Sequence, residues 1–350
     1  MKKNVFRKKS KIYGILYRIL ILPAIFLSLV ILMILLITYV QFFQPIGNTG
    51  QEWIVNIPNG AGAYQVANLL VKTGVLKSKW EFMWLIKYTN TETKLKAGEY
   101  RISGELNIID LHNAIVKGDV MHYKVTFPEG LTSSDIAYIL EANGFCLKKE
   151  FLKVCEDKEI LTKYNIDSVS AEGYIFPETY DFSKNYPSNK ILSKCLQEFD
   201  TTAGNLDMIN RMDIINASWN LKLTKHDFVT LASIVEKEGR DREDQRKIAT
   251  VFLNRLKINK PLESCATVCY AIGRWGQEPT KAETKTISPY NTFTNKGLPP
   301  GPICNPGKNA LYSVLYPENG KWLYFMGKGD GTHTFTNTYK EHRRAIKQYR

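Results

Sequence analysis

Two acidic residues, Glu236 and Glu238, follow an apolar run in the stretch "LASIVEKEGR" at residues 231–240. A carboxyl group buried among apolar side chains is disfavoured as an anion, so its pKa rises and it keeps a proton near neutral pH. A protonated carboxyl group of this kind is what general acid catalysis requires. The stretch therefore indicates acid–base chemistry, provided that one of the two carboxyl groups points into the protein.

Helical geometry favours Glu238 over Glu236 as the inward-facing acid. At about 100° per residue, Glu238 shares a helix face with Leu231 and Val235, whereas Glu236 points about 140° away from Leu231. We predict Glu238 as the general acid, with Glu236 as second choice, and we expect Gly239 to leave space for another group to approach. The alternative is that Glu238 curls out to solvent or pairs with a following arginine.

Two helices are expected around these acids. The first runs from Thr224 to about Arg240, with Thr224 as the N-cap and Asp227 three residues later. The second covers "RKIATVFLNRL" at residues 246–256 and carries Asn254. Asn254 could place a bound ligand or orient Glu238; the alternative is that it caps the next loop.

Two further segments are candidates for walls of a site. Residues 288–307, "SPYNTFTNKGLPPGPICNPG", are rich in Pro, Gly and Asn, which excludes a helix or a central strand. A long irregular loop inside a compact domain is usually functional. Residues 321–342, "KWLYFMGKGDGTHTFTNTYKEH", are predicted to form a β-hairpin that turns through the glycines.

The chain contains a duplication upstream of these segments. "VNIPNGAGAYQVANLLVKTGVLKSK" begins at Val55, and "VTFPEGLTSSDIAYILEANGFCLKK" begins at Val125, so Pro58 aligns with Pro128. Each copy predicts a short strand, a Pro-x-Gly turn and a helix ended by Gly. Residues 97–120 between the copies predict another strand, a turn and a second helix.

Positive charge is concentrated at the N-terminus. The net charge is +13, and the acid-free first 18 residues carry seven positive side chains, namely Lys2, Lys3, Arg7, Lys8, Lys9, Lys11 and Arg18. The remaining excess is too small to indicate nucleic-acid binding. Residues 19–40, "ILILPAIFLSLVILMILLITYV", are uncharged and long enough to span a bilayer. The basic flank predicts a cytoplasmic N-terminus and an uncleaved anchor; the alternative is a long signal peptide.

The six cysteines do not form a metal-binding pattern. Cys265 and Cys269 are four residues apart, but no second Cys/His pair follows at zinc-site spacing. We expect buried thiols or one local disulfide, and neither a metal nor a cofactor.

The catalytic stretches resemble a known family. "LASIVEKEG", "VFLNRL", the loop at 288–307, the hairpin segment and "EGYIFPETY" at 172–180 are together similar to the MltG-like (YceG-like) endolytic murein transglycosylases. "VTFPEGLTSSDIAYIL" resembles the LysM modules, which bind N-acetylglucosamine polymers; the alternative is a βα packing module without a ligand. The resemblance implies internal cleavage of nascent peptidoglycan strands near the membrane, by one essential Glu that corresponds to Glu238. The stretch around Glu238 also resembles the Glu followed by a small residue in soluble lytic transglycosylases, in which Ser or Thr is more usual at the position of Gly239.

The resemblance also implies a mechanism with a single acid. Glu238 protonates the oxygen of the MurNAc–GlcNAc β-1,4 bond, then acts as a base on the C6 hydroxyl of MurNAc, which closes on C1 to give a 1,6-anhydro end. A glycan cleft needs aromatic and amide side chains. The expected substrate-binding residues are Tyr290, Asn291, Thr292, Asn254, Glu172, Tyr174, Glu178 and His333; loop packing is the alternative for each.

The expected fold class is α+β, and four parts are predicted. They are a basic cytoplasmic tail (1–18), a single transmembrane helix (19–40), a duplicated LysM-like α/β portion (45–160), and a catalytic domain (161–350) with a helical core, the Pro/Gly loop and a C-terminal β-hairpin. This predicts a single-pass protein of the inner membrane with an extracytoplasmic, periplasmic catalytic domain. Expected partners are peptidoglycan strands, the membrane, and peptidoglycan synthases with divisome or elongasome proteins. A non-catalytic peptidoglycan-binding scaffold is the alternative function.

Overall fold

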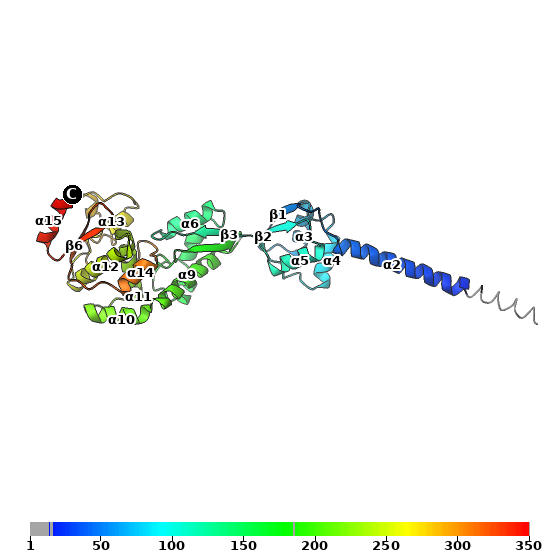
Figure 1. Ribbon diagram of the computed structural model, residues 1–350, viewed down its shortest axis with the longest axis horizontal. Helices are drawn as coiled ribbons and strands as arrows, with labels where there is room; N and C mark the ends of the chain where they lie inside the picture. Colours follow the sequence, from blue (N-terminus) through cyan, green and yellow to red (C-terminus); the bar gives the residue numbers. More distant parts are fainter. Residues whose placement is uncertain (1–13, 15–16, 185, 350) are drawn as a thin grey trace, which may run out of the picture. The chain divides into compact units, whose positions relative to one another are not determined.

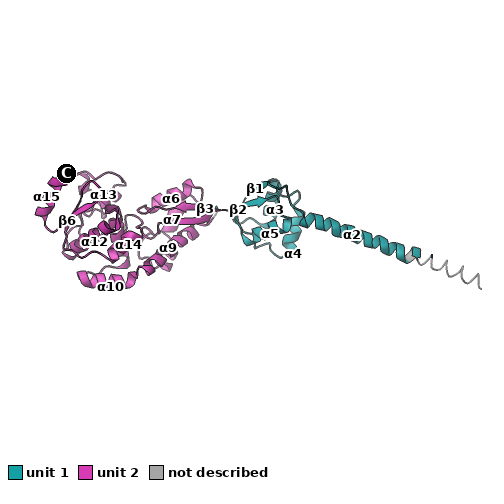
Figure 2. Cartoon of the chain, in the orientation of Figure 1, with its two compact units in different colours: residues 1–121, 183–185 teal, residues 122–182, 186–350 magenta. Residues whose placement is uncertain are grey.

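The computed structural model describes residues 14, 17–184 and 186–349, and the chain divides into two compact units (Figures 1 and 2). Unit 1 comprises Met1–Met121 with Ser183–Asn185, and unit 2 comprises His122–Phe182 with Tyr186–Arg350. Most of the predicted tail at 1–18 lies outside the described residues. The division at 121/122 falls inside the range 45–160 that the sequence predicts as one portion.

Unit 1 begins with an apolar helix. A π-helical turn, η1 (Tyr17–Ile21), leads into α2 (Leu22–Phe43), whose mean hydropathy reaches 2.6 and none of whose residues is buried. By length and composition α2 can span a membrane. It overlaps the predicted span of residues 19–40 and continues three residues further.

The rest of unit 1 is a small α/β fold. Strands β1 (Glu52–Ile57) and β2 (Gly98–Ser103) pair antiparallel, from Glu52 opposite Ser103 to Ile57 opposite Gly98. Alternation along β1 directs Val55 and Ile57 into the core. Three helices pack on this pair: α3 (Ala63–Lys72), α4 (Trp80–Tyr88) and α5 (Ile108–Lys117). Helix α4 is not among the elements that the sequence predicts.

The second copy of the duplication belongs to unit 2. Strand β3 (His122–Thr126) pairs with β4 (Thr179–Ser183), and α6 (Ser133–Ala142) follows with a capping box of Thr132 and Asp135. Helices α7 (Lys148–Cys155) and α8 (Lys158–Lys163) complete this part. The apolar side chains of this copy join the large core of unit 2, not the core of the first copy. The two copies therefore fold around different cores.

A helical core makes up the centre of unit 2. Its central member is α11 (Lys225–Glu238), in which every residue from Phe228 to Val235 is buried. Helix α11 begins at the predicted N-cap Thr224. Around it are α9 (Ser188–Asn205), α10 (Met208–Trp219), α12 (Arg242–Lys257), α13 (Cys265–Ala271) and α14 (Lys308–Leu315).

The remaining segments of unit 2 are a loop, a strand pair and a final helix. After the short 3₁₀ helix η2 (Glu283–Lys285), residues 288–307 contain no helix or strand. Strands β5 (Tyr324–Gly327) and β6 (His333–Thr336) pair antiparallel. Helix α15 (Tyr339–Tyr349) follows them, so the segment predicted as a hairpin up to His342 ends in a helix. The expected mixture of helix and sheet is confirmed, and the likeness to LysM modules stays a prediction.

Candidate active site

Unit 2 contains a cleft of about 1060 Å³ into which Glu238 opens at the end of α11. His333 of β6 and Arg255 of α12 also line it. Large aromatic side chains form much of the remaining wall: Trp275, Phe293, Tyr324, Phe325, Tyr339 and Tyr349. Aromatic rings beside a few polar groups are the surface that a polar ligand with apolar faces requires.

The surroundings of Glu238 act on its carboxyl group in two opposing directions. Burial raises the pKa of Glu238, which favours the protonated acid. Ser264 Oγ donates a hydrogen bond to Glu238 Oε1 at 2.5 Å, and this bond, the backbone N–H of Ala266 and the nearby His333 each lower the pKa. The group can therefore hold a proton before reaction and is stabilised as an anion after releasing it.

The irregular segment between α12 and α13 brings Ser264 to Glu238. The preceding residue, Glu263, adopts a left-handed backbone conformation with φ of 53°, which is uncommon for a residue with a side chain. Its N–H donates to the Thr292 carbonyl, and its carboxylate accepts from Arg255 Nη1 at 2.9 Å. Arg255 Nε in turn donates to the Leu323 carbonyl at 2.7 Å. These bonds link α12, the segment between α12 and α13, and the segment that leads into β5 around Glu238.

His333 is held by a buried carboxylate. Its Nδ1 lies 2.7 Å from Asp244 Oδ2, and the side chains of His333 and Asp244 are 14% and 10% exposed. With Nδ1–H donating to Asp244, Nε2 is the ring nitrogen left for the cleft. The pair thus supplies an oriented imidazole in the same cleft as Glu238.

Glu236 has a different environment from Glu238. It does not line the cleft, and its Oε2 accepts a hydrogen bond from the Gly307 N–H at 3.0 Å. Burial raises the pKa of Glu236 to about 7. Perturbation of the pKa therefore does not distinguish the two acids, whereas access to the cleft does.

The missing side chain at Gly239 makes room for a neighbouring helix of the same unit. A Cβ atom at this position would lie 2.7 Å from Gln245 Cγ and 3.1 Å from Ile248 Cδ1. Its φ of −111° is open to any residue, so the requirement for glycine comes from packing. The group that approaches Gly239 is the first part of α12.

The Pro/Gly loop contributes Phe293 to the wall of the cleft, and its three predicted site residues hold the surrounding backbone. Thr292 is buried, and its Oγ1 accepts from the Ser264 N–H at 3.0 Å. Asn291 is also buried, and its Nδ2 donates to the carbonyls of Thr284 and Thr286. Tyr290 packs against another tyrosine ring, with 4.8 Å between the ring centroids. None of these three residues lines the cleft.

The predicted residues from "EGYIFPETY" also lie away from the cleft. Glu172 accepts from the Ser133 N–H and from Asn305 Nδ2, both at 3.1 Å, and burial raises the pKa of Glu172 to about 7. Tyr174 is 1% exposed and lies against a histidine, and Glu178 is exposed. These contacts join the β3–α6 part to the helical core.

The side chain of Asn254 bonds to other parts of the protein and does not line the cleft. Its Oδ1 accepts from Trp219 Nε1 at 2.9 Å, and its Nδ2 donates to the carbonyls of Gly320 and Trp322. These bonds fix the segment that leads into β5. The residues that the structure brings together are therefore Glu238 and His333 among those predicted, with Ser264, Asp244, Glu263 and Arg255 added.

For the site residues that the sequence did not predict, the neighbouring sequence suggests only a structural role. Ser264 precedes a short helix as its N-cap residue, and Asp244 is an acid in the first turn of α12. Arg255 shares the stretch "VFLNRL" with Asn254, and nothing local distinguishes the two. No signal in the sequence pairs these residues with the cleft, because their partners come from distant segments.

Two of the six cysteines, Cys265 and Cys269, line the cleft. None of the six cysteines forms a disulfide in the part of the chain that the structure describes, and four of them are buried: Cys155, Cys195, Cys269 and Cys304. In the part of the chain that the structure describes, His, Cys, Asp and Glu side chains do not gather in a group of three or more suited to a metal ion.

Comparisons with known proteins identify the family. Residues 55–348 match the model of the YceG-like family. The chain is 30% identical over 315 residues to the endolytic murein transglycosylase of Bacillus subtilis (strain 168), covering 84% of each chain. It is 29% identical over 338 residues to the protein of the same name from Streptococcus pneumoniae (strain D39), covering 87% of this chain and 60% of that relative.

A solved structure agrees with this match. The crystal structure of a yceG-like protein from Listeria monocytogenes superposes with a TM-score of 0.56 at 29% identity, covering 85% of this chain and 99% of the other. The match over most of the chain makes this protein a member of the YceG-like family.

Proposed function

We propose that this protein is a lytic transglycosylase that cleaves the MurNAc-β-1,4-GlcNAc bond within peptidoglycan strands and leaves 1,6-anhydro-MurNAc ends. The observation that carries the proposal is Glu238, a half-buried acid with a raised pKa at the wall of an aromatic-lined cleft. The names of the Bacillus and Streptococcus relatives give the substrate class, murein, and the endolytic mode.

Glu238 performs both proton transfers in this scheme. Its proton goes to the glycosidic oxygen, the C1–O4 bond breaks with its electron pair moving to that oxygen, and positive charge develops at C1. The Glu238 anion, stabilised by Ser264 Oγ and the Ala266 N–H, then takes the proton of the C6 hydroxyl as that oxygen bonds to C1. The acid is restored and no water is consumed.

His333 is the second group that faces the reacting sugar. Asp244 fixes its Nδ1, which directs Nε2 to a hydroxyl or acetamido group of the substrate. In this role His333 binds substrate, and Asp244 is a positioning residue. The aromatic wall would pack against the apolar faces of the sugar rings.

Membrane attachment through α2 completes the proposal. The basic residues that precede α2 favour a cytoplasmic N-terminus in a single-pass protein of the inner membrane, with the cleft on the outer, periplasmic side. This location suits cleavage of nascent strands beside peptidoglycan synthases of the divisome or elongasome. Affinity capture of the detergent-solubilised chain should recover such synthases; recovery of none would contradict the partnership.

Product analysis tests the activity. The full chain in detergent is incubated with purified peptidoglycan strands, and the new strand ends are identified by mass spectrometry. Anhydro ends are expected. Ends that have gained a water would make the protein a hydrolase, and strands that bind but stay uncut would favour the alternative of a non-catalytic scaffold.

A further inference from the structure

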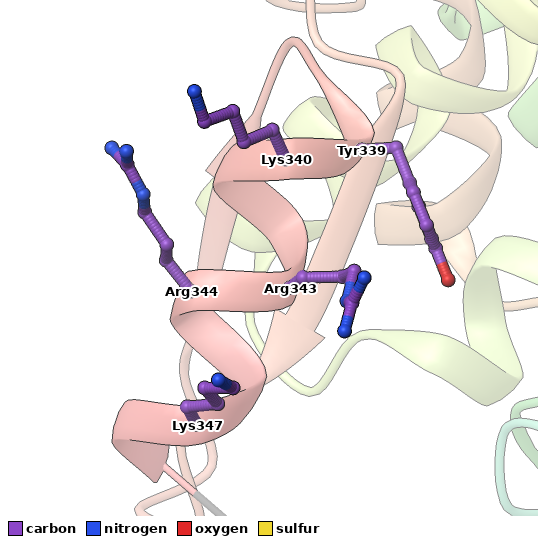
Figure 3. A pocket seen from close by; sticks show the side chains of 5 residues that line it. All are labelled: Tyr339, Lys340, Arg343, Arg344 and Lys347. Atoms are coloured by element: carbon purple, nitrogen blue, oxygen red, sulfur yellow. The ribbon is translucent and has the colours of Figure 1, made fainter.

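Helix α15 presents two adjacent faces with different chemistry. One face lines the cleft through Tyr339, His342, Ile346 and Tyr349. The neighbouring face carries four cations, Lys340, Arg343, Arg344 and Lys347, which are all exposed and enclose a recess of about 300 Å³ together with Tyr339 (Figure 3). We define these four residues as the basic face of α15.

The basic face is continuous with the rim of the cleft. Tyr339 borders both the cleft and the recess. At about 100° per residue, Arg343 lies only about 40° from Tyr339 around the helix. In Figure 3, Tyr339 and Arg343 extend to one side of α15, and Lys340 and Arg344 extend to the other. A chain that leaves the cleft over Tyr339 therefore meets Arg343 first.

The acid nearest to the basic face is Glu341, whose pKa is lowered by the backbone N–H of Thr338 and, to a smaller extent, by the charge of Arg344. Among the residues that the structure describes, none of the four cations forms a salt bridge within 4.0 Å. Glu341, on the same helix, accepts the N–H groups of Asn337 and Thr338 at the helix start.

The spacing of the four cations works against the helix itself. They form like-charge pairs at i,i+3 and i,i+4, which destabilise a helix. A helix selected for solubility alone would intersperse acids on this face. The concentration of cations beside the cleft therefore indicates an anionic ligand.

We propose that the basic face of α15 is a binding site for the carboxylates of the peptide stems that project from a glycan strand held in the cleft. This inference rests on the proposed function, because that function supplies the strand. Guanidinium groups bind carboxylates through paired hydrogen bonds, and the two lysines add charge without fixed geometry. The site would select strands that carry stems over bare glycan.

The test compares two substrates with two sets of variants. The full chain in detergent is assayed on strands with intact stems and on the same strands after an amidase has removed the stems. The test variant combines Lys340→Gln, Arg343→Gln, Arg344→Gln and Lys347→Gln. The matched control combines Lys163→Gln, Lys190→Gln, Lys222→Gln and Lys257→Gln, which removes the same charge from exposed positions of unit 2 outside the cleft and outside the predicted LysM-like portion.

The test variant is expected to raise KM about tenfold on stem-bearing strands, the size of a few exposed charge pairs, and to leave the cleavage of stem-free strands unchanged. The control should match the wild type on both substrates. A charge-keeping variant, Arg343→Lys with Arg344→Lys, should retain most of the affinity for stems. Thermal unfolding shows whether each variant is folded.

Three outcomes would overturn the inference. An unchanged KM on stem-bearing strands would do so, as would an equal rise on both substrates. A defect that appears only in micelles containing anionic phospholipid, and equally on both substrates, would assign the basic face to the membrane surface instead. Failure of the wild type to cleave either substrate would contradict the proposed function separately.

Discussion

The hydrogen bond from Ser264 to Glu238 can be tested through the pH dependence of the activity. Ser264→Ala removes a donor that lies 2.5 Å from Glu238 Oε1 and stabilises the anion. A hydrogen bond to a charged group contributes about 1.5–3 kcal/mol, which corresponds to about one to two pH units in the titration of the acid. Because the reaction starts from protonated Glu238, activity is lost on the alkaline side as Glu238 ionises. The variant should therefore shift the alkaline limb upward by about one to two pH units.

The assay is kcat/KM for strand cleavage measured from acidic to alkaline pH. Ser313→Ala is the matched control, because Ser313 is a buried serine of unit 2 outside the cleft. Its alkaline limb should coincide with that of the wild type. An alkaline limb that stays in place or moves downward in Ser264→Ala would refute the assignment of Glu238 as the acid.

Three other substitutions have defined outcomes. Asp244→Asn removes the carboxylate that orients His333 at 2.7 Å, so kcat/KM should fall about tenfold while thermal unfolding stays near that of the wild type; undiminished activity would contradict the role of Asp244. Gly239→Ala places a Cβ 2.7 Å from Gln245 Cγ and should lower the free energy of unfolding by about 1–3 kcal/mol in denaturant titrations, whereas an unchanged value would contradict the packing argument. Burial raises the pKa of Glu236 from 4.5 to about 7 in the folded chain. Between these two pH values Glu236 is protonated in the folded chain and ionised in the unfolded chain, so the free energy of unfolding falls as the pH rises through this window. Glu236→Gln should reduce that slope and be about 2 kcal/mol more stable than the wild type at pH 8, and an unchanged slope would count against burial as the cause.

The sequence predicted the helix start correctly where the stabilising contact lies between residues close together in the chain. The capping box at Thr224 forms as predicted, since a cap depends on residues three positions apart. The same kind of signal occurs at Thr338 and Glu341, which mark the start of α15. The start of α15 was not predicted, because residues 321–342 were all assigned to the β-hairpin.

The two acids of α11 differ in access to the cleft but not in burial. Glu238 does open into the cleft, as its alignment with Leu231 and Val235 predicted. Helix α11 is, however, buried on all sides from Phe228 to Val235, so an apolar stripe does not mark its only inner face. For this reason Glu236 is also partly buried, although the pattern placed it away from the core.

Contacts between distant segments could not be predicted from periodicity or spacing. Ser264 and Glu238 are 26 residues apart, and Asp244 and His333 are 89 residues apart. The two similar strand–turn–helix copies were predicted to form one portion of the chain. In the structure they pack into different units. Only the tertiary structure shows which partner each copy finds.

The most direct test of the central claim compares Glu238→Gln with Glu236→Gln. Both replacements keep the size of the side chain and remove its proton, and only the first affects the cleft. The strand ends produced by each full-length variant are measured by mass spectrometry. We predict that anhydro ends disappear with Glu238→Gln and persist with Glu236→Gln. Anhydro ends that persist with Glu238→Gln would contradict the account.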